Sequence, residues 1–226
     1  MSDAKPGARG TKASSATLDH LVVAATTLAD GIDYVATVTG VAPQPGGRHV
    51  AMGTHNALLK LGARVYLEII AVDPQGTKPP RPRWFELDNP MLQSELLERP
   101  RLIHWVARTA AIDRAAGACP LPLGPVHAMA RGDYCWRITI PDDGTLPAKG
   151  IVPTLIQWDV PLHPADTLPA SGVTLAQLAA TCRDPAPVRA ALAALGLDGT
   201  IAVTFDRGTR LAAMLRTPRG IVTLTS

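Results

Sequence analysis

A short pattern of residues occurs twice in this chain, and the repeat constrains the fold more than any other feature of the sequence. The segment Leu18-Asp-His-Leu-Val-Val-Ala-Ala25 has a counterpart in Leu102-Ile-His-Trp-Val-Ala-Arg-Thr109, with leucine, histidine and valine at the same three positions. Both segments alternate around β-forming residues, which is typical of strands. His20 and His104 therefore lie in the middle of two related strands.

Each of these strands is followed by the same succession of expected elements. After the first, apolar residues at helical spacing predict a helix over 28–39, and Gly40 supplies its C-terminal stop. After the second, a shorter helix is expected over 112–118. Three short strands are then expected in each half, at 48–52, 57–61 and 64–72 in the first and at 126–130, 134–140 and 150–158 in the second. The chain thus predicts two β-α-β-β-β modules.

The remaining segments divide the chain around these modules. We predict a disordered leader at residues 1–16, a first module at 17–74, a proline-rich connection at 75–100, a second module at 101–164 and a C-terminal α+β extension at 165–226. The connection is rich in proline and charge, so we expect it to cross between the modules outside the core. In the extension we expect helices over 173–181 and 187–195, followed by three strands.

Composition excludes several classes of protein. Hydrophobic residues make up 46% of the 226, while 21 prolines and 19 glycines are too few for a low-complexity chain, so a packed core is expected. The net charge of +3 lies partly in the leader, at Lys5, Arg9 and Lys12. Without a basic stripe, and with aromatic residues at only 4%, nucleic acid is not an expected partner.

The cysteines and the apolar runs bear on the compartment. Cys119, Cys135 and Cys182 are odd in number and form no Cys-x-x-Cys pair, which favours reduced thiols. The leader has no apolar segment of the kind found in secretory signals, and no run of 18 apolar residues offers a membrane span. We expect a cytoplasmic protein with no membrane partner.

The sequence also resembles a known superfamily. A duplicated β-α-β-β-β unit, with a histidine in each first strand and Glu68 or Gln157 in the fourth, resembles the vicinal oxygen chelate superfamily, which includes glyoxalase I, extradiol dioxygenases and antibiotic-binding proteins. The stretches 46–62 and 66–74, together with Leu155-Ile-Gln-Trp158, are similar to its glyoxalase-like domain branch. The similarity spans about Thr17 to Leu178. It implies an α+β fold in which two paired modules form a curved mixed sheet around one cleft.

The resemblance further implies a metal site. His20, Glu68 and His104 map onto three ligand positions, and an overlay of the two fourth strands places Gln157 at the remaining one. Imidazole, carboxylate and amide groups together suit zinc, nickel, manganese or iron(II). Glutamine ligates through its carbonyl oxygen but cannot act as a general base. No organic cofactor is expected.

Each of these residues has a simpler interpretation. A histidine in an apolar strand is commonly a hydrogen-bonded core residue. Glu68 lies in a strongly apolar run, where an unpaired carboxylate costs several kcal/mol, and pairing with Arg48 or Arg64 is the alternative to metal binding. Asp19 directly precedes His20, so strand alternation predicts that it faces the opposite side of the sheet.

A second group of residues is predicted to line a substrate pocket. Some flank the turn at Gly53-Thr54, others lie in strands of the second module, and one lies in a loop. They are His49, His55, Asn56, Trp136, Trp158 and His163. Turn formation is the alternative role for the first three, core packing for the tryptophans and loop anchoring for the last.

Two functions fit these expectations. The first is a metal-dependent enzyme that acts on a small oxygen-rich organic substrate, of the lyase, isomerase or ring-cleaving dioxygenase type. The second is a non-catalytic protein that binds or sequesters a small molecule on the same fold. Either one takes a small-molecule ligand and is compatible with a homodimer.

Overall fold

The computed structural model describes residues 15–226, and its main element is an eight-stranded mixed sheet. The strand order is β2-β3-β4-β1-β5-β8-β7-β6. The strands are β1 (Thr17–Ala24), β2 (Gln44–His49), β3 (Thr54–Gly62), β4 (Val65–Val72), β5 (Arg101–Arg108), β6 (Val126–Arg131), β7 (Tyr134–Thr139) and β8 (Thr154–Trp158). Two β-α-β-β-β units therefore lie side by side, joined where β1 pairs antiparallel with β5. The predicted α+β class is confirmed.

The helices of the two units form where the sequence predicts them. Helix α1 (Leu28–Thr39) begins after Thr27, whose hydroxyl accepts a hydrogen bond from the Asp30 backbone N–H, and it ends at Gly40 in the left-handed conformation. Helix α3 (Ile112–Ala118) follows β5. Each crossover returns the chain to a parallel partner of its first strand, β4 beside β1 and β8 beside β5.

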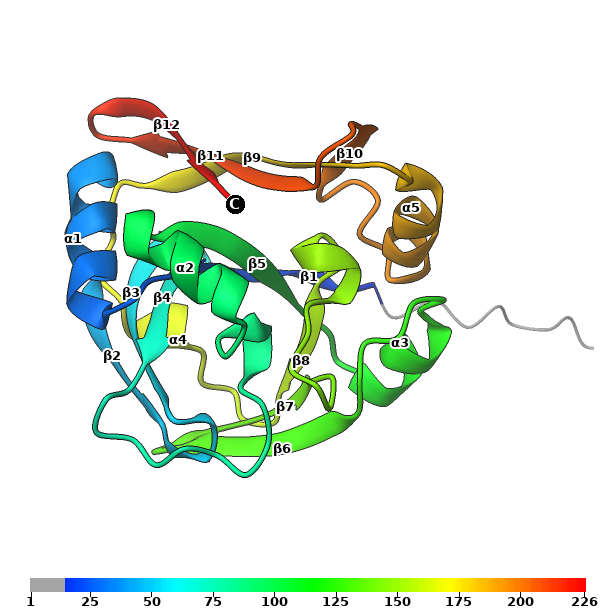
Figure 1. The fold of residues 1–226 in the computed structure, drawn as a ribbon, viewed down its shortest axis with the longest axis horizontal. Helices are drawn as coiled ribbons and strands as arrows, with labels where there is room; N and C mark the ends of the chain where they lie inside the picture. The colour runs from blue at the N-terminus through cyan, green and yellow to red at the C-terminus, as the bar shows by residue number, and fades with distance from the viewer. Residues whose placement is uncertain (1–14) are drawn as a thin grey trace, which may run out of the picture.

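The sheet curves strongly. Strands β2 and β6 stand at opposite ends of the strand order, yet they contact each other, and Figure 1 shows both at the lower side of the molecule. Alternate residues of β1 separate its two faces: Leu21 and Val23 pack on the convex side, whereas Val22 and Ala24 pack on the concave side. The concave face encloses the candidate site.

The connection between the modules enters the core, so its predicted course outside the core is wrong. It contains a short 3-10 turn (Trp84–Glu86) and helix α2 (Pro90–Glu98). Trp84 and Phe85 are buried in the cluster that fills the concave face, and Leu87 and Leu96 join them. Prolines and charged residues flank an apolar middle part of this segment. This part is buried because it covers apolar side chains on the concave face of the curved sheet.

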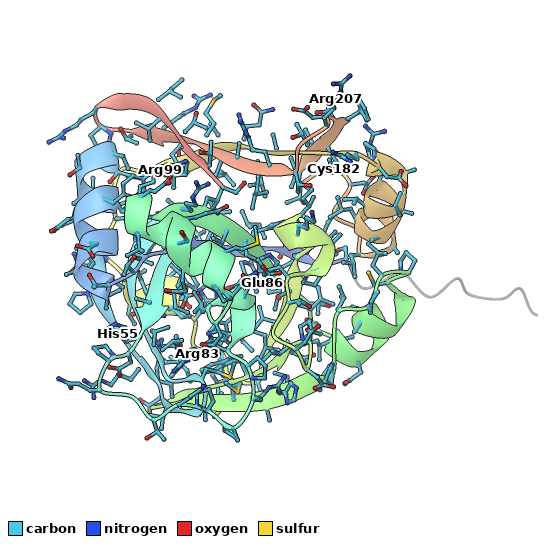
Figure 2. All side chains as sticks on the ribbon, in the orientation of Figure 1. His55, Arg83, Glu86, Arg99, Cys182 and Arg207 are labelled. Carbon is cyan, nitrogen blue, oxygen red and sulfur yellow. The ribbon has the colours of Figure 1, made fainter. Side chains whose placement is uncertain are left out.

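Two polar side chains fasten the connection to both modules (Figure 2). The Arg83 Nε donates to the Gly53 carbonyl at 3.4 Å, and its Nη1 pairs with Asp88 at 2.6 Å. The Glu86 carboxylate accepts from the Leu146 backbone N–H at 3.1 Å. The segment therefore forms a cover that is tied to one module on each side.

The C-terminal extension forms a second, four-stranded sheet, which lies above the main sheet in Figure 1. Its order is β10-β9-β11-β12. After the short helix α4 (Pro164–Thr167), its elements are β9 (Thr174–Cys182), α5 (Pro185–Ala194), β10 (Ala202–Phe205), β11 (Arg210–Thr217) and β12 (Gly220–Thr225). The helix predicted over 173–181 is thus a strand. Alanine favours helix there, but Leu178, Ala180 and Cys182 are buried at alternate positions, and pairing with two neighbouring strands decides the outcome.

The small sheet covers the convex face of the main sheet. Side chains of its strands and of α5 join those of β1, β4 and β5 in one apolar cluster. Residues 1–14 of the predicted leader lie outside the described residues, whereas Ala16 is buried and its backbone N–H donates to the Leu195 carbonyl. In the described part of the chain, no helix combines the length and apolar character needed to cross a membrane.

Candidate functional site

A narrow cavity lies on the concave face, between the main sheet and the cover. Its volume of about 30 Å³ holds roughly two water molecules. The polar lining comes from His20, His49, Asn56, Tyr66, Glu68 and Arg131. The apolar lining comes from Trp84, Phe85, Trp136, Ile138, Ile156 and Trp158. A polar floor built mainly on the first module therefore faces an aromatic wall.

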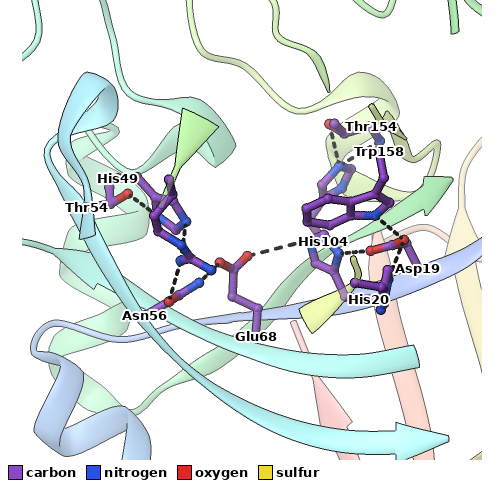
Figure 3. A network of polar contacts seen from close by, with 11 residues as sticks. Asp19, His20, His49, Thr54, Asn56, Glu68, His104, Thr154 and Trp158 are labelled. Atoms are coloured by element: carbon purple, nitrogen blue, oxygen red, sulfur yellow. Dashed lines mark hydrogen bonds and ion pairs between the residues drawn. The ribbon is translucent and has the colours of Figure 1, made fainter. Parts of the chain in front are cut away.

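His20 is held between two carboxylates. Its Nδ1 lies 2.7 Å from the Asp19 carboxylate, and its Nε2 lies 3.6 Å from that of Glu68 (Figure 3). The Tyr66 ring stacks on the imidazole, with ring centroids 4.5 Å apart. The first contact is a hydrogen bond and the second is too long for one, so Nε2 faces the cavity beside Glu68 without being hydrogen-bonded to it.

Asp19 does not face away from His20, so the expectation from strand alternation is wrong. The pairing of β1 with β5 shifts register between Leu18 and His20, and this irregularity places Asp19 outside the normal alternation. Asp19 is fully buried and also accepts from the Trp158 indole N–H at 3.0 Å and contacts His163 at 3.1 Å. Burial alone would raise the pKa of Asp19, but the hydrogen bonds from His163 and His20 outweigh it and hold the pKa far below the usual range.

Glu68 is partnered by an amide rather than by an arginine. The Asn56 Nδ2 donates to its Oε1 at 2.6 Å. Arg48 pairs with Asp73 and Arg64 with Asp166, so the predicted pairing of Glu68 with either arginine is wrong. A single amide hydrogen bond fixes the orientation of the Glu68 carboxylate while leaving its Oε2 free to face His20.

Arg131 joins the second module to the first across the open side of the curved sheet. Its Nη1 donates to the Asn56 Oδ1 and to the His49 Nε2, each at 3.1 Å. Burial lowers the pKa of His49 to about 3, and the charge of Arg131 adds to this effect. His49 is therefore neutral at physiological pH. Its Nδ1 lies 3.1 Å from the Thr54 hydroxyl, which leaves Nε2 as the acceptor for Arg131.

His104 is held on both ring nitrogens by the protein itself. Its Nδ1 lies 3.1 Å from the Gly150 carbonyl, and its Nε2 accepts from the Thr154 backbone N–H at 3.0 Å. Burial lowers the pKa of His104 to about 3 despite the hydrogen bond to Gly150. A neutral ring that donates from Nδ1 and accepts at Nε2 satisfies both contacts, as expected of a hydrogen-bonded core histidine.

The strand pairing corrects the overlay of Glu68 on Gln157. Val22 lies opposite Glu68 in the β1–β4 pair, and Val106, its counterpart in the repeat, lies opposite Thr154 in the β5–β8 pair. Thr154 is therefore the equivalent of Glu68. Gln157 lies three residues further on, and an odd shift turns a side chain to the other face of a strand. Its Oε1 accepts from the Ile112 backbone N–H at the start of α3.

The four candidate metal ligands therefore do not converge. His20 and Glu68 face each other, but His104 has no free ring nitrogen and Gln157 lies on the opposite face. In residues 15–226, no group of three or more histidine, cysteine, aspartate or glutamate side chains is arranged to hold a metal ion. This donor set does not fit the four-ligand centre that the resemblance implies.

The predicted pocket residues divide into two groups. His49, Asn56, Trp136 and Trp158 line the cavity. His55 is not among its lining residues, and His163 lies behind Asp19, where its Nδ1 also accepts from the Ala165 backbone N–H. The latter contact is the loop-anchoring role given as its alternative.

Sequence reasoning missed several residues of the site. Tyr66 stands two positions before Glu68, so strand periodicity places it on the same face and was a usable signal. Arg131 carried no such signal, because it reaches the site across the gap between two edge strands. Trp84 and Phe85 were missed because they lie in the connection.

Comparison with known proteins agrees with this architecture. A family model described as a glyoxalase-like domain matches residues 18–196. A crystal structure of a hypothetical protein from Staphylococcus aureus shares 12% identity, with 86% of this chain and 87% of that chain covered at a TM-score of 0.53, and it shows the same fold. Methylmalonyl-CoA epimerase from Mycobacterium tuberculosis shares 17% identity over 67% of this chain and 94% of that chain, at a TM-score of 0.40.

A search of curated proteins found no match. The matched family model covers well over half of the chain, including both modules and the first strand and helix of the extension. The chain therefore belongs to the family of glyoxalase-like domains.

Proposed function

We propose that this chain is an enzyme of the isomerase or lyase type, which transfers a proton on a small oxygen-rich substrate bound in the cavity. The observation that carries the proposal is the position of His20, with a carboxylate hydrogen-bonded to Nδ1 and a second carboxylate 3.6 Å from Nε2. A catalytic base needs one nitrogen fixed and the other open to the substrate.

The chemistry follows from these contacts. Asp19 accepts the Nδ1–H of His20, so the lone pair of Nε2 points toward the cavity. His20 takes a proton from a carbon next to a carbonyl group; the C–H electron pair forms a C=C bond and the carbonyl π pair moves onto oxygen, which gives an enolate. The imidazolium formed lies between Asp19 and Glu68, and both negative charges stabilise it. Return of the proton to the former carbonyl carbon, while the proton of a hydroxyl group on the first carbon moves to the enolate oxygen, completes the isomerisation of a hydroxycarbonyl compound without any oxidant or reductant.

A second candidate is binding without catalysis. The aromatic side chains of Trp84, Phe85, Trp136 and Trp158 line one side of the cavity, and such a wall favours a flat organic ligand. In that case the buried polar groups orient the ligand and no bond is broken.

Proton exchange distinguishes these candidates. The protein is incubated in deuterated buffer with 2-oxo acids, with 2-hydroxy acids, and with methylglyoxal plus glutathione, and exchange is followed by proton NMR. We expect accelerated exchange next to a carbonyl group for at least one compound. His20→Asn is expected to lower that rate by about 10²–10⁴-fold, the usual contribution of a general base.

The matched control is His127→Asn, since His127 lies on β6 outside the cavity lining. A His20→Asn protein that exchanges protons as fast as the wild type would contradict the proposal. A protein that binds a compound of the panel but exchanges no proton supports the binding function instead. Oxygen consumption with catechol would point to the ring-cleaving class.

A further inference from the structure

We infer that the substrate is a carboxylate, held by the Arg131 guanidinium and the Trp84 indole N–H at the end of the cavity away from Asp19. This inference rests on the proposed function and names the class of molecule on which it acts. It follows from two sets of hydrogen-bond donors that line the cavity without protein partners.

The first set belongs to Arg131. A guanidinium has five N–H donors. The two on Nη1 are used by His49 and Asn56, while Nε and Nη2 have no hydrogen-bond partner within residues 15–226. Nor does any carboxylate of that part of the chain lie within 4.0 Å of Arg131, whereas Arg48, Arg64 and Arg137 each have at least one. Arg131 lines the cavity and thus has three N–H donors, and no directly paired carboxylate, left for a ligand.

The second donor belongs to the cover. Trp84 is 4% exposed, lines the cavity, and its Nε1 is buried without a hydrogen-bond partner. A buried donor without a partner is unfavourable, and a hydrogen bond to a ligand oxygen in the cavity removes this cost. His49 packs edge-on against the Trp84 ring at 5.0 Å and also accepts from Arg131, so it connects the two donors.

Charge and shape together favour a carboxylate. A planar carboxylate accepts two parallel hydrogen bonds from a guanidinium, a geometry that a neutral carbonyl cannot match. Flat aromatic rings line one side of the cavity, which favours a planar carboxylate over the tetrahedral phosphate group. With the carboxylate at Arg131, the neighbouring carbon is directed toward the end of the cavity where His20 and Glu68 lie.

Tryptophan fluorescence provides a test that does not depend on catalysis, because three tryptophans line the cavity. Pyruvate, its neutral analogue pyruvamide and inorganic phosphate are titrated against the wild type and against Arg131→Gln, Trp84→Phe and Arg137→Gln. Arg137 pairs with Asp113 and Asp159 outside the cavity lining and serves as the matched control.

We expect saturable quenching by millimolar pyruvate and at least about tenfold weaker binding of pyruvamide. Arg131→Gln should weaken pyruvate binding at least about tenfold and abolish the preference over pyruvamide. Trp84→Phe, which keeps the ring and removes the N–H, should weaken pyruvate binding about threefold to tenfold. Arg137→Gln should bind as the wild type does.

Three results would overturn the inference. They are the absence of saturable quenching by pyruvate, equal affinity of the wild type for pyruvate and pyruvamide, and an Arg131→Gln protein that loses affinity for both compounds to the same extent. Phosphate that binds tighter than pyruvate and displaces it would assign the site to a phosphate group instead. His20→Asn separates this inference from the proposed function. Pyruvate binding that persists in His20→Asn while exchange is lost agrees with both. A wild type that binds pyruvate but exchanges no proton with any compound refutes the enzyme alone, while equal exchange of pyruvate and pyruvamide refutes the carboxylate alone.

Discussion

The two histidines of the repeat differ in the residue that lies next to each of them in the fourth strand of its module. His20 faces Glu68, and its Nε2 remains open to the cavity, whereas His104 has Thr154 in the equivalent position and is closed by hydrogen bonds. The Glu68 carboxylate lies 3.6 Å from the His20 Nε2 without closing it, while the Thr154 backbone N–H donates to the Nε2 of the second imidazole and gives a satisfied core contact. The same residue type therefore faces the cavity in one module and packs in the core of the other.

Removal of His104 is expected to affect stability. His104→Ala leaves the Gly150 carbonyl and the Thr154 N–H without partners and opens a cavity in the core, so the free energy of unfolding should fall by about 2–4 kcal/mol. Urea denaturation followed by tryptophan fluorescence measures this change. His127→Ala, at a partly buried position on β6, should cost less than about 1 kcal/mol. Equal stability of the two variants would argue against the packing role of His104.

Two neutral buried histidines should also make stability depend on pH. Folding lowers the pKa of His49 and of His104 from 6.5 to about 3. Between pH 6.5 and about 3 the unfolded chain binds protons that the folded protein does not. The free energy of unfolding is therefore greatest above pH 6.5 and decreases as the pH falls through this range. Each histidine contributes about 1.4 kcal/mol per pH unit. Unfolding curves at several pH values measure the slope, and His49→Gln should reduce it by one proton; an unchanged slope would contradict the assignment.

At the scale of helices and strands, the sequence predicts those elements whose formation depends on neighbouring residues alone. Helices α1 and α3 and strand β1 form over the predicted residues, because their caps and periodicities are local. Strand β9 and the cover do not follow local patterns: strand pairing and an apolar surface elsewhere in the chain determine them. The register shift at Asp19 is likewise set by the pairing of β1 with β5, so this part of the site lies beyond prediction from periodicity.

The cover contains an unusual backbone turn that offers a matched pair of variants. Phe85 and Glu86 both have positive φ, at 59° and 57°, a region that favours glycine. Glu86→Ala loses the hydrogen bond to Leu146 and should lower stability by about 1–2 kcal/mol. Glu86→Gly loses the same bond but relieves the backbone, so it should be more stable than Glu86→Ala by roughly 1 kcal/mol. Thermal unfolding of both proteins tests the order, and the reverse order would contradict it.

At the scale of the whole molecule, the two duplicated modules form the curved sheet, and the differences between them form the candidate site. The repeat predicts two modules around one concave face, and the sheet order confirms that arrangement. It also suggests two equivalent sets of ligands, which the structure does not contain: the polar groups come from the first module and from Arg131, while the second module contributes mainly aromatic side chains. The overlay of the two fourth strands by sequence therefore fails, because it places Gln157, three residues beyond the partner of Val106, at the position of Glu68.

This asymmetry predicts the response to metals. Because only His20 and Glu68 of the four candidate ligands face each other, zinc, nickel, manganese or iron(II) should raise the melting temperature by less than about 2 °C. Elemental analysis of the purified protein should find less than one equivalent of metal. Stoichiometric metal, with a large stabilisation that is lost in Glu68→Ala, would show that the side chains rearrange to complete a centre.

Arg131 lines the cavity and also a groove on the outside of the molecule, next to β2 and the β6–β7 turn. The opposite approach is closed by the cover, which Arg83 and Glu86 fasten to both modules. An anion that enters past Arg131 therefore meets a positive charge that no carboxylate pairs directly before it reaches His20. Long-range attraction of this kind accelerates encounter and is screened by salt. The association rate of an anionic ligand should consequently fall as ionic strength rises, while that of a neutral analogue stays constant.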